Sequence, residues 1–208
     1  MDYLFDSLET GPLQVNCYLF GSQESGEAVI VDPGGDAGKI LRRLTQMGLR
    51  PGTVILTHGH FDHIGAAAEL QRASNCDVLL HADDLFLVEE AANHASEWGI
   101  PFGNTPKITG FLQDGQHLEL GGVTLDVLHT PGHTPGGVCL KVGTNVVVGD
   151  SLFAGSIGRT DLPGGDYDQL IRSIRTQLLT LPDNTRCLPG HGPATTIGQE
   201  RRGNPFIA

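Results

Sequence analysis

The order of apolar segments along the chain predicts a mixed α/β fold, in which two mixed sheets pack face to face and helices lie outside. Strands and helices alternate in the first half. Short strands then follow one another as hairpins, and a helix and a strand come last. A chain of 208 residues is long enough for one substantial hydrophobic core. We therefore expect a single domain over residues 1–208.

The first half alternates between strand and helix signals. LQVNCYLF and EAVIVD are rich in apolar and β-branched residues, and the turn-forming GSQESG separates them. After DPGGD, apolar residues such as Ile40 and Leu44 recur at helical spacing. The predicted strands of this half are 13–20, 27–32, 53–56 and 77–81, and the predicted helices are 37–48 and the alanine-rich segment 65–74.

The second half begins with a helical pattern over 83–98, which Asp83 or Asp84 would cap. GIPFGNTPKITG is rich in glycine and proline and is predicted to be a loop. Glycine-containing turns separate the short strands that follow. The predicted strands are 117–120, 123–129, 138–142 and 145–149, followed by a helix at 166–181 and the final strand and loop TRCLPGHG.

Composition argues against two classes of partner. The formal net charge is −11, with 13 basic and 24 acidic residues, so the clustered positive charge that a nucleic-acid binder needs is missing. No run approaches 18 apolar residues, so we expect no membrane span. The first residues, MDYLFDSLETGPLQ, do not have the pattern of a signal peptide. We therefore expect a cytoplasmic protein.

The cysteines support the same compartment. Cys17, Cys76, Cys139 and Cys187 are far apart and form no CxxC pair. This pattern is typical of reduced, mostly buried thiols and not of a disulfide framework or a zinc knuckle.

THGHFDH (57–63) follows an apolar strand and holds three of the nine histidines. His58 and His60 are two residues apart, so in extended backbone both side chains point to the same side. Asp62 and His63, in the turn to the next helix, can face a second point nearby. One metal cannot easily bind all four side chains, but two neighbouring metals can. Taken alone, the segment could also be a solvated polar loop.

Three later segments repeat the arrangement of strand, glycine turn and metal-binding side chain. They supply His133 after TPG, Asp150 after VVVG and His191 after LPG. Five histidines and two aspartates suit two metals: three histidines for one, an aspartate and two histidines for the other, and one bridging carboxylate. Nitrogen and oxygen ligands of this kind fit zinc, iron or manganese and do not choose among them.

The HxHxDH motif, followed by His, Asp and His at strand ends, resembles the metallo-β-lactamase-fold hydrolases. Within them the chain is most similar to the glyoxalase II (hydroxyacylglutathione hydrolase) group in its short form, as NCYLF, GSIGRTDLPGGD and ERRGNPFI also indicate. The resemblance implies an αββα sandwich and two divalent metal ions, zinc first. It implies His58, His60 and His133 on one metal, Asp62, His63 and His191 on the other, and Asp150 as the bridge.

This site implies hydrolysis of an anionic small-molecule thioester. Two divalent metals leave a net charge of about +1 after two aspartates and a hydroxide are counted, so the pocket should attract anions. Metal coordination lowers the pKa of water toward ~7 and provides hydroxide at neutral pH. Asp62 could steer the proton of this nucleophile. A thiolate of pKa ~8.5 leaves without a strong general acid, whereas an amide would need one and no candidate is evident.

The chain departs from the longer glyoxalase II enzymes in its substrate contacts. Those enzymes carry a helical domain after the last histidine ligand, whereas only 17 residues follow His191 here. Their glutathione-binding Lys and Tyr have no match in GRTDLPGG. Arg159 lies in this segment and could bind the anionic substrate, or it could form a structural ion pair with Asp161 or Asp166.

Other functions of the same fold remain open. A persulfide dioxygenase would share the ligand residues and a similar GRTD segment but would use one iron and molecular oxygen. The LPGG that follows GRTD favours the hydrolase. A β-lactamase is less favoured, because the better-known zinc lactamases have a cysteine where Asp150 lies. A non-catalytic metal-buffering scaffold would be expected to lose ligands, and none is lost.

The remaining candidates receive ordinary roles. His129 could compete with His133 for a metal, but we interpret it as the end of a strand. Asp32 is predicted to form a turn, with support of a ligand histidine as the alternative. Trp98 is predicted to pack. His81, His94 and His117 have no partner pattern.

Overall fold

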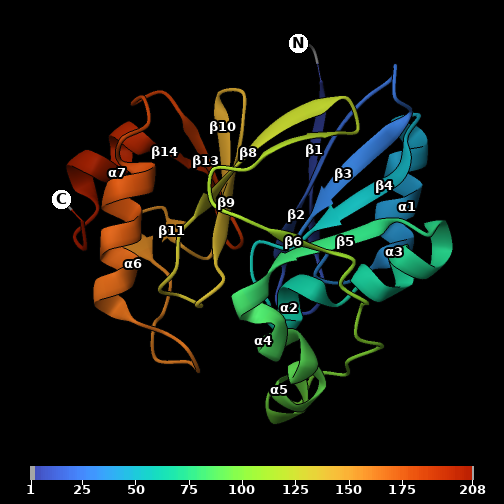
Figure 1. Cartoon of the computed structure of the whole chain (residues 1–208), viewed down its shortest axis with the longest axis horizontal. Helices are drawn as coiled ribbons and strands as arrows, with labels where there is room; N and C mark the ends of the chain where they lie inside the picture. The colour runs from blue at the N-terminus through green and yellow to red at the C-terminus, as the bar shows by residue number, and fades with distance from the viewer. Residues whose placement is uncertain (1–2, 208) are drawn as a thin grey trace.

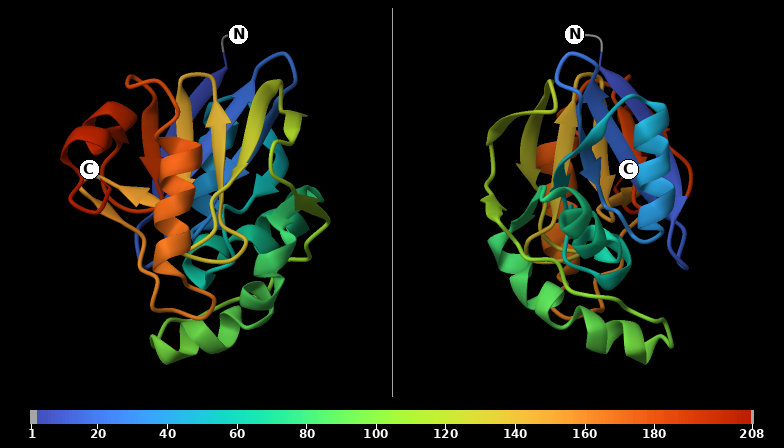
Figure 2. Two further views of the ribbon diagram at one scale, coloured as in Figure 1. Left: turned by 60° about the vertical axis from the view of Figure 1, so that its left-hand side comes forward. Right: turned by 90° about the vertical axis from the view of Figure 1, so that its right-hand side faces the viewer.

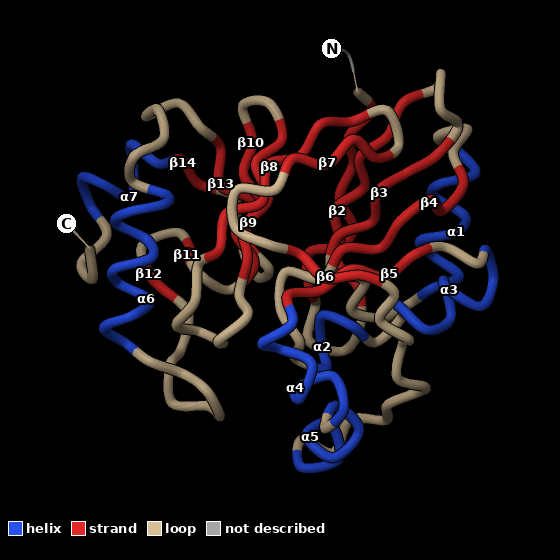
Figure 3. The backbone as a smooth tube through the Cα atoms, viewed as in Figure 1, coloured by secondary structure: helices blue, strands red, loops and turns tan. Residues whose placement is uncertain are grey.

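The computed structural model describes residues 3–207 and shows two six-stranded sheets packed face to face, with helices outside (Figures 1 and 3). The first sheet has the order β1-β2-β3-β4-β5-β6 and the second the order β14-β13-β10-β9-β8-β7. The first sheet consists of β1 (Leu4–Thr10), β2 (Val15–Ser22), β3 (Glu27–Val31), β4 (Arg50–Ile55), β5 (Asp77–His81) and β6 (Gly110–Leu112). The second consists of β7 (His117–Leu120), β8 (Val123–His129), β9 (Val138–Val142), β10 (Asn145–Gly149), β13 (Arg186–Pro189) and β14 (Thr195–Thr196).

Helices cover the outer faces of both sheets. Next to the first sheet lie α1 (Ala37–Gln46), α2 (Phe61–Ile64) and α3 (Ala67–Ser74), and beyond it a 3-10 turn (Ala82–Asp84), α4 (Leu85–Glu89) and α5 (Ala91–Glu97). Next to the second lie α6 (Tyr167–Ser173), a π-helical turn (Ile174–Leu178), α7 (Ile197–Gly203) and the small hairpin of β11 (Leu152–Phe153) and β12 (Ser156–Ile157). Both sheets contain parallel and antiparallel pairs.

Successive side chains along a strand point to opposite faces of the sheet, and this places them in different hydrophobic clusters. In β3, Val29 and Val31 face the cluster between the two sheets, whereas Ala28 and Ile30 face the cluster under α1 and α3. Both faces of β3 are therefore buried, which is why EAVIV is nearly continuous in apolar residues. A third cluster lies between the second sheet and α6.

The structure corrects the sequence prediction in four places. No strand was predicted before residue 13, yet β1 is an edge strand, and its weakly alternating burial explains the omission. The predicted helix 83–98 is a 3-10 turn and two short helices, because Glu90 leaves helical geometry at φ −90°, ψ 1°. The predicted helix 166–181 becomes π-helical after Ser173. Gly110, predicted as loop, begins β6.

The short strands β11, β12 and β14 were also not predicted, because two-residue strands leave no periodic pattern. The helix α7 was not predicted either. No helix within residues 3–207 is long and apolar enough to cross a membrane. The four cysteines are buried as free thiols.

Contacts between the sheets position one end of the sandwich. Tyr18 of β2 donates its hydroxyl hydrogen bond to the Pro189 carbonyl at 2.7 Å, and Asn16 donates to the Pro189 and Gly192 carbonyls. The backbone N–H of Val138 donates to the Thr57 carbonyl at 2.8 Å. Figure 2 shows α4, α5 and the loop between β12 and α6 at one common end of the molecule.

Candidate metal centre

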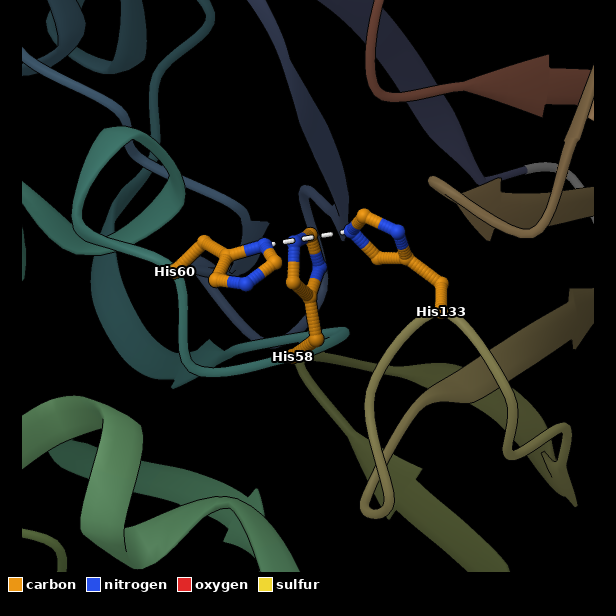
Figure 4. A group of neighbouring side chains, drawn as sticks. All are labelled: His58, His60 and His133. Atoms are coloured by element: carbon orange, nitrogen blue, oxygen red, sulfur yellow. Dashed lines mark hydrogen bonds between the residues drawn. The ribbon is translucent and has the colours of Figure 1, made fainter. Parts of the chain in front are cut away.

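The first ligand group consists of His58, His60 and His133, whose rings face one another from two loops (Figure 4). His58 and His60 follow β4, and His133 follows β8. The Nε2 of His133 lies 3.1 Å from the Nδ1 of His60, and all three side chains are buried. A loop exposed to solvent, which the motif alone left open, is therefore excluded.

Two imidazoles of this group, those of His58 and His60, are held neutral. Burial, with neighbouring histidines, lowers the pKa of His58 well below its ordinary value. Burial and the proximity of His133 lower the pKa of His60 to about 3. The Nε2 of His58 is buried and lacks a hydrogen-bond partner among the described residues. Neutral imidazoles with free lone pairs are what a divalent metal requires.

The second group consists of Asp62, His63 and His191. The Nε2 of His191 lies 3.2 Å from the Oδ2 of Asp62, and the Nε2 of His63 lies 3.8 Å from the same oxygen. Burial alone would lower the pKa of His63, but three surrounding carboxylates outweigh it and raise the pKa well above its ordinary value. This surplus of negative charge favours a cation at the centre of the group.

Asp150 connects the two groups. Its Oδ1 lies 3.4 Å from the Nε2 of His63, and its Oδ2 lies 3.8 Å from the Nε2 of both His133 and His191. One carboxylate thus reaches histidines of both groups. Its approach depends on Gly190, because a Cβ there would clash with the Oδ1 of Asp150.

The donor set fits two divalent metal ions. Among the described side chains, the buried nitrogen and oxygen atoms without partners are the Nε2 of His58, the Nε2 of His63 and the Oδ1 of Asp150, and all three point into this centre. Polar atoms are seldom buried unpaired, so their coincidence here fits a site that binds a cation. Imidazole and carboxylate donors suit zinc, iron or manganese.

Asp32 supports the second group from behind. Its Oδ2 lies 3.0 Å from the Nδ1 of His63, and its carboxylate accepts hydrogen bonds from the backbone N–H and the hydroxyl of Thr57, both at 2.7 Å. The Nδ1–H of His63 therefore points to Asp32, which leaves Nε2 for a metal. Asp32 also has a positive φ of 52°. The contact with His63 agrees with the alternative interpretation, support of a candidate ligand histidine, and no turn is assigned at Asp32 itself.

A cavity of about 470 Å³ opens onto both groups. Its inner wall is formed by His60, Asp62, His133, Asp150 and His191. Its outer walls come from four separate segments and contain Leu13, Phe61, His94, Glu97, Trp98, Arg159, Leu162 and Pro163. Trp98, predicted to pack, has its ring 6.2 Å from that of Phe61 and also forms part of this wall, where it is 54% exposed.

Arg159 contributes twice. Its side chain lines the cavity and forms a forked ion pair with Asp161, at 2.7 and 2.8 Å. Its backbone carbonyl accepts a hydrogen bond from the Nδ1–H of His133 at 2.7 Å. The same residue that faces the cavity therefore fixes the orientation of a candidate ligand, which the sequence did not reveal.

The histidines that were set aside have partners. The rings of His81 and His129 stack at 4.2 Å, inclined by only 13°, and the Nε2 of His129 donates to the Pro135 carbonyl. His81, Asp83 and His129 are close enough for a metal, but parallel rings direct their lone pairs side by side, not toward one point. His117 pairs with Asp126. His94 lines the cavity, which its position in the sequence did not indicate.

The family follows from comparison with known proteins. A model of the metallo-β-lactamase superfamily matches residues 10–191. The chain belongs to this superfamily. Its members are mostly metal-dependent hydrolases that bind divalent metals. The match confirms both the resemblance and the sandwich fold predicted from the sequence.

Individual relatives differ in what their names state. Hydroxyacylglutathione hydrolase GloC of Haemophilus influenzae is 42% identical over 203 residues, which cover 93% of each chain. Among solved structures, BLEG-1 B3 metallo-β-lactamase has a TM-score of 0.91 at 40% identity and covers 99% of this chain and 100% of its own. The structure of TTHA1623 in a di-iron-bound form has a TM-score of 0.89 at 44% identity and covers 97% of this chain and 100% of its own. The structure of ETHE1 from Myxococcus xanthus has a TM-score of 0.82 at 28% identity and covers 97% of this chain and 83% of its own.

Proposed function

We propose that this protein is a metal-dependent thioester hydrolase that acts on S-lactoylglutathione or a related hydroxyacyl-glutathione. The observation that carries the proposal is the pair of ligand groups, joined by Asp150, at the base of a cavity that also contains Arg159. The similarity to a relative named hydroxyacylglutathione hydrolase supports the choice of substrate.

We assign one metal to His58, His60 and His133 and the other to Asp62, His63 and His191, with Asp150 between them. Bound divalent metals would supply hydroxide at neutral pH and polarise the thioester carbonyl. Asp62 is the proposed catalytic residue, because its carboxylate lies in the cavity wall, where it can hold the proton of the attacking nucleophile. Burial raises the pKa of Asp62, but His63 and His191 outweigh burial and lower it, so the carboxylate is ionised and can accept that proton.

The walls of the cavity suit an anionic thioester with apolar portions. Arg159 supplies a guanidinium for a substrate carboxylate. Leu13, Phe61 and Trp98 supply an apolar surface, and the rings of Phe61 and Trp98 lie 6.2 Å apart. His94 and Glu97 also line the cavity, and a thiolate leaving group does not need a proton from either side chain.

Zinc is the proposed metal, with iron or manganese as alternatives. The similarity to TTHA1623, whose structure holds two irons, shows that a related chain accepts iron. We propose a cytoplasmic location, supported by the four free cysteines. The proposed partner is the small-molecule substrate alone, without nucleic acid or membrane.

A mononuclear iron persulfide dioxygenase is the second candidate. The structural similarity to ETHE1 favours it. In that enzyme class a single iron and molecular oxygen would replace hydrolysis, and Asp62, His63 and His191 would have no second metal to bind.

The deciding experiment combines elemental analysis of the purified protein with three assays. These are hydrolysis of S-lactoylglutathione, oxygen uptake with glutathione persulfide, and hydrolysis of a chromogenic cephalosporin. We expect nearly two metals per chain and thioester hydrolysis without oxygen uptake. One iron per chain with oxygen consumed would establish the dioxygenase instead. Cephalosporin turnover above thioester turnover would assign the protein to the β-lactamases.

A further inference from the structure

Asp84 is a fully buried carboxylate outside the proposed ligand set, in the 3-10 turn after β5. Its Oδ2 accepts hydrogen bonds from the backbone N–H of Gly59 at 3.0 Å and from the hydroxyl of Thr134 at 2.7 Å. Its Oδ1 accepts from the backbone N–H of Gly136 at 2.6 Å. Three bonds to one buried carboxylate are strong only because they are directed and charge-assisted.

The partners of Asp84 belong to the two loops that hold the first ligand group. Gly59 lies between His58 and His60, and Thr134 follows His133 directly. A single carboxylate is therefore bonded to both of the segments whose separation determines whether three histidines can share one metal.

The contact leaves no free space. A Cβ at Gly59 would lie 2.7 Å from the Asp84 carbonyl oxygen, and a Cβ at Gly136 would lie 2.8 Å from the carboxylate carbon and Oδ1 of Asp84. The two glycines thus allow the loops to close on the carboxylate from both sides. Asp84 therefore helps to fix the spacing of the loops, together with the backbone hydrogen bond from Val138 to Thr57.

The second ligand group is held by a different carboxylate. Asp32 contacts His63 and Thr57, and the bonds of Asp84 reach neither Asp62, His63 nor His191. Asp32 is bonded directly to a ligand ring of the second group and reaches the first group only through Thr57, whose Oγ1 lies 3.1 Å from the Nδ1 of His58. Asp84 is bonded only to groups beside the ligands of the first group.

We propose that Asp84 is a positioning residue that sets the metal affinity of the first group and leaves that of the second nearly unchanged. The inference rests on the proposed assignment of two metal groups. Its consequence is a variant that binds a single metal, at Asp62, His63 and His191. Residues that orient ligands typically change metal affinity by roughly 10- to 100-fold, and we expect a loss in this range at the first group.

The test uses the Asp84→Asn variant, with Asp83→Asn as a matched control. Asp83 is the adjacent aspartate in the same turn, but its side chain is 59% exposed. The metal-free proteins are titrated with Zn²⁺ against a chelating dye, and Co²⁺ spectra identify which group fills. We expect Asp84→Asn to lose affinity at the first group only. Asp83→Asn should match the parent protein. Asp32→Asn should weaken the second group more than the first, because Asp32 bonds directly to His63 and reaches His58 only through Thr57.

Equal weakening of both groups in Asp84→Asn, or no weakening, would overturn the inference. If Asp84→Asn does not fold, Thr134→Val replaces it, because it removes one of the three bonds, with Thr134→Ser as the conservative variant that restores binding. Failure of the proposed function is distinguishable, because it appears in the parent protein as fewer than two metals. If the parent binds one metal, the inference requires Asp84→Asn to lose that metal when Co²⁺ spectra place it at the first group.

Discussion

Arg159 has separate roles for its backbone and its side chain. The carbonyl oxygen orients His133, and that contact does not depend on the identity of the side chain. The guanidinium lines the cavity while paired with Asp161 in an exposed ion pair, with side-chain exposures of 50% and 68%. Exposed pairs contribute little to stability. The guanidinium is therefore free to exchange Asp161 for a substrate carboxylate at low cost.

Arg159→Ala should accordingly raise KM for S-lactoylglutathione by roughly tenfold, with kcat changed by less than about twofold, because only binding of an anion is removed. The unfolding temperature and the metal content should remain those of the parent. Steady-state kinetics and elemental analysis provide the measurements. Arg202→Ala is the control, since Arg202 forms a comparable exposed pair with Asp183. An unchanged KM would exclude a substrate role for Arg159.

His60 couples the stability of the metal-free protein to pH. Its pKa is about 3 in the folded state and about 6.5 in the unfolded chain. Between these values the unfolded state binds more protons, so the free energy of unfolding decreases as pH falls from 6.5 toward 3, by up to roughly 1.4 kcal/mol per pH unit. His58 acts in the same direction. His63 and His191, whose pKa values are raised, contribute a stabilisation that is fully present below pH 6.5 and is lost only as pH rises above it, so they do not add to the slope below 6.5.

Urea unfolding of the chelated protein between pH 4 and 7 measures this dependence. His60→Asn removes one of the two groups responsible and should flatten the pH profile below 6.5. Gln23→Ala, which changes an exposed side chain that does not titrate, should leave the profile unchanged. Parallel profiles for the parent protein and His60→Asn would show that His60 is protonated in the folded state.

At the scale of elements, the sequence predicted those segments whose burial leaves a periodic pattern. Strand β8, with Val123, Leu125 and Val127 buried in alternation, is one example. The pattern fails where tertiary contacts decide. In β1, only Thr10 of seven residues is fully buried, and pairing with β2 makes it a strand. The break at Glu90 leaves no trace in composition, yet it separates α4 from the helix that forms a cavity wall.

Helix α5 brings His94 to the cavity, where it could protonate a leaving group. A thiolate needs no such proton. We therefore expect His94→Ala to keep kcat for S-lactoylglutathione within about twofold of the parent. Its pH profile for kcat should also be unaltered, as measured by steady-state assays from pH 6 to 9. Asn93→Ala, on the exposed side of the same helix, is the control. A loss of kcat by 100-fold or more would identify His94 as a general acid and would weaken the case for a thioester.

At the scale of the whole molecule, the candidate site was predictable as far as strand ends and glycine turns placed its ligands. Each of the seven side chains follows a strand directly or after a short turn, and packing of the two sheets brings those ends together. Asp84 could not be predicted, because its partners Gly59, Thr134 and Gly136 are 25, 50 and 52 residues away. Asp84 gains its role only when the two sheets pack and bring these partners to it, and the sequence pattern does not reveal that packing.

The hydrophobic core and the candidate ligands consist of different residues, and this predicts what happens when metal is removed. The three hydrophobic clusters lie between the layers and involve none of the seven candidate ligands. The fold should therefore persist without metal, and chelation should leave the far-UV circular dichroism spectrum unchanged. Stability should nevertheless fall, because a ligand that binds only the folded state stabilises it by about 2.7 kcal/mol at a free concentration 100 times Kd.

For a protein of this size, that loss corresponds to a decrease in Tm of about 5–11 °C. Thermal unfolding of chelated and zinc-reconstituted protein measures it, and Tm should rise with the logarithm of free zinc. Magnesium, which prefers oxygen ligands and keeps several waters, is the matched control and should not restore Tm. Loss of the circular dichroism signal on chelation would instead show that the two sheets need the metals to pack, since the clusters alone would not hold the sandwich together.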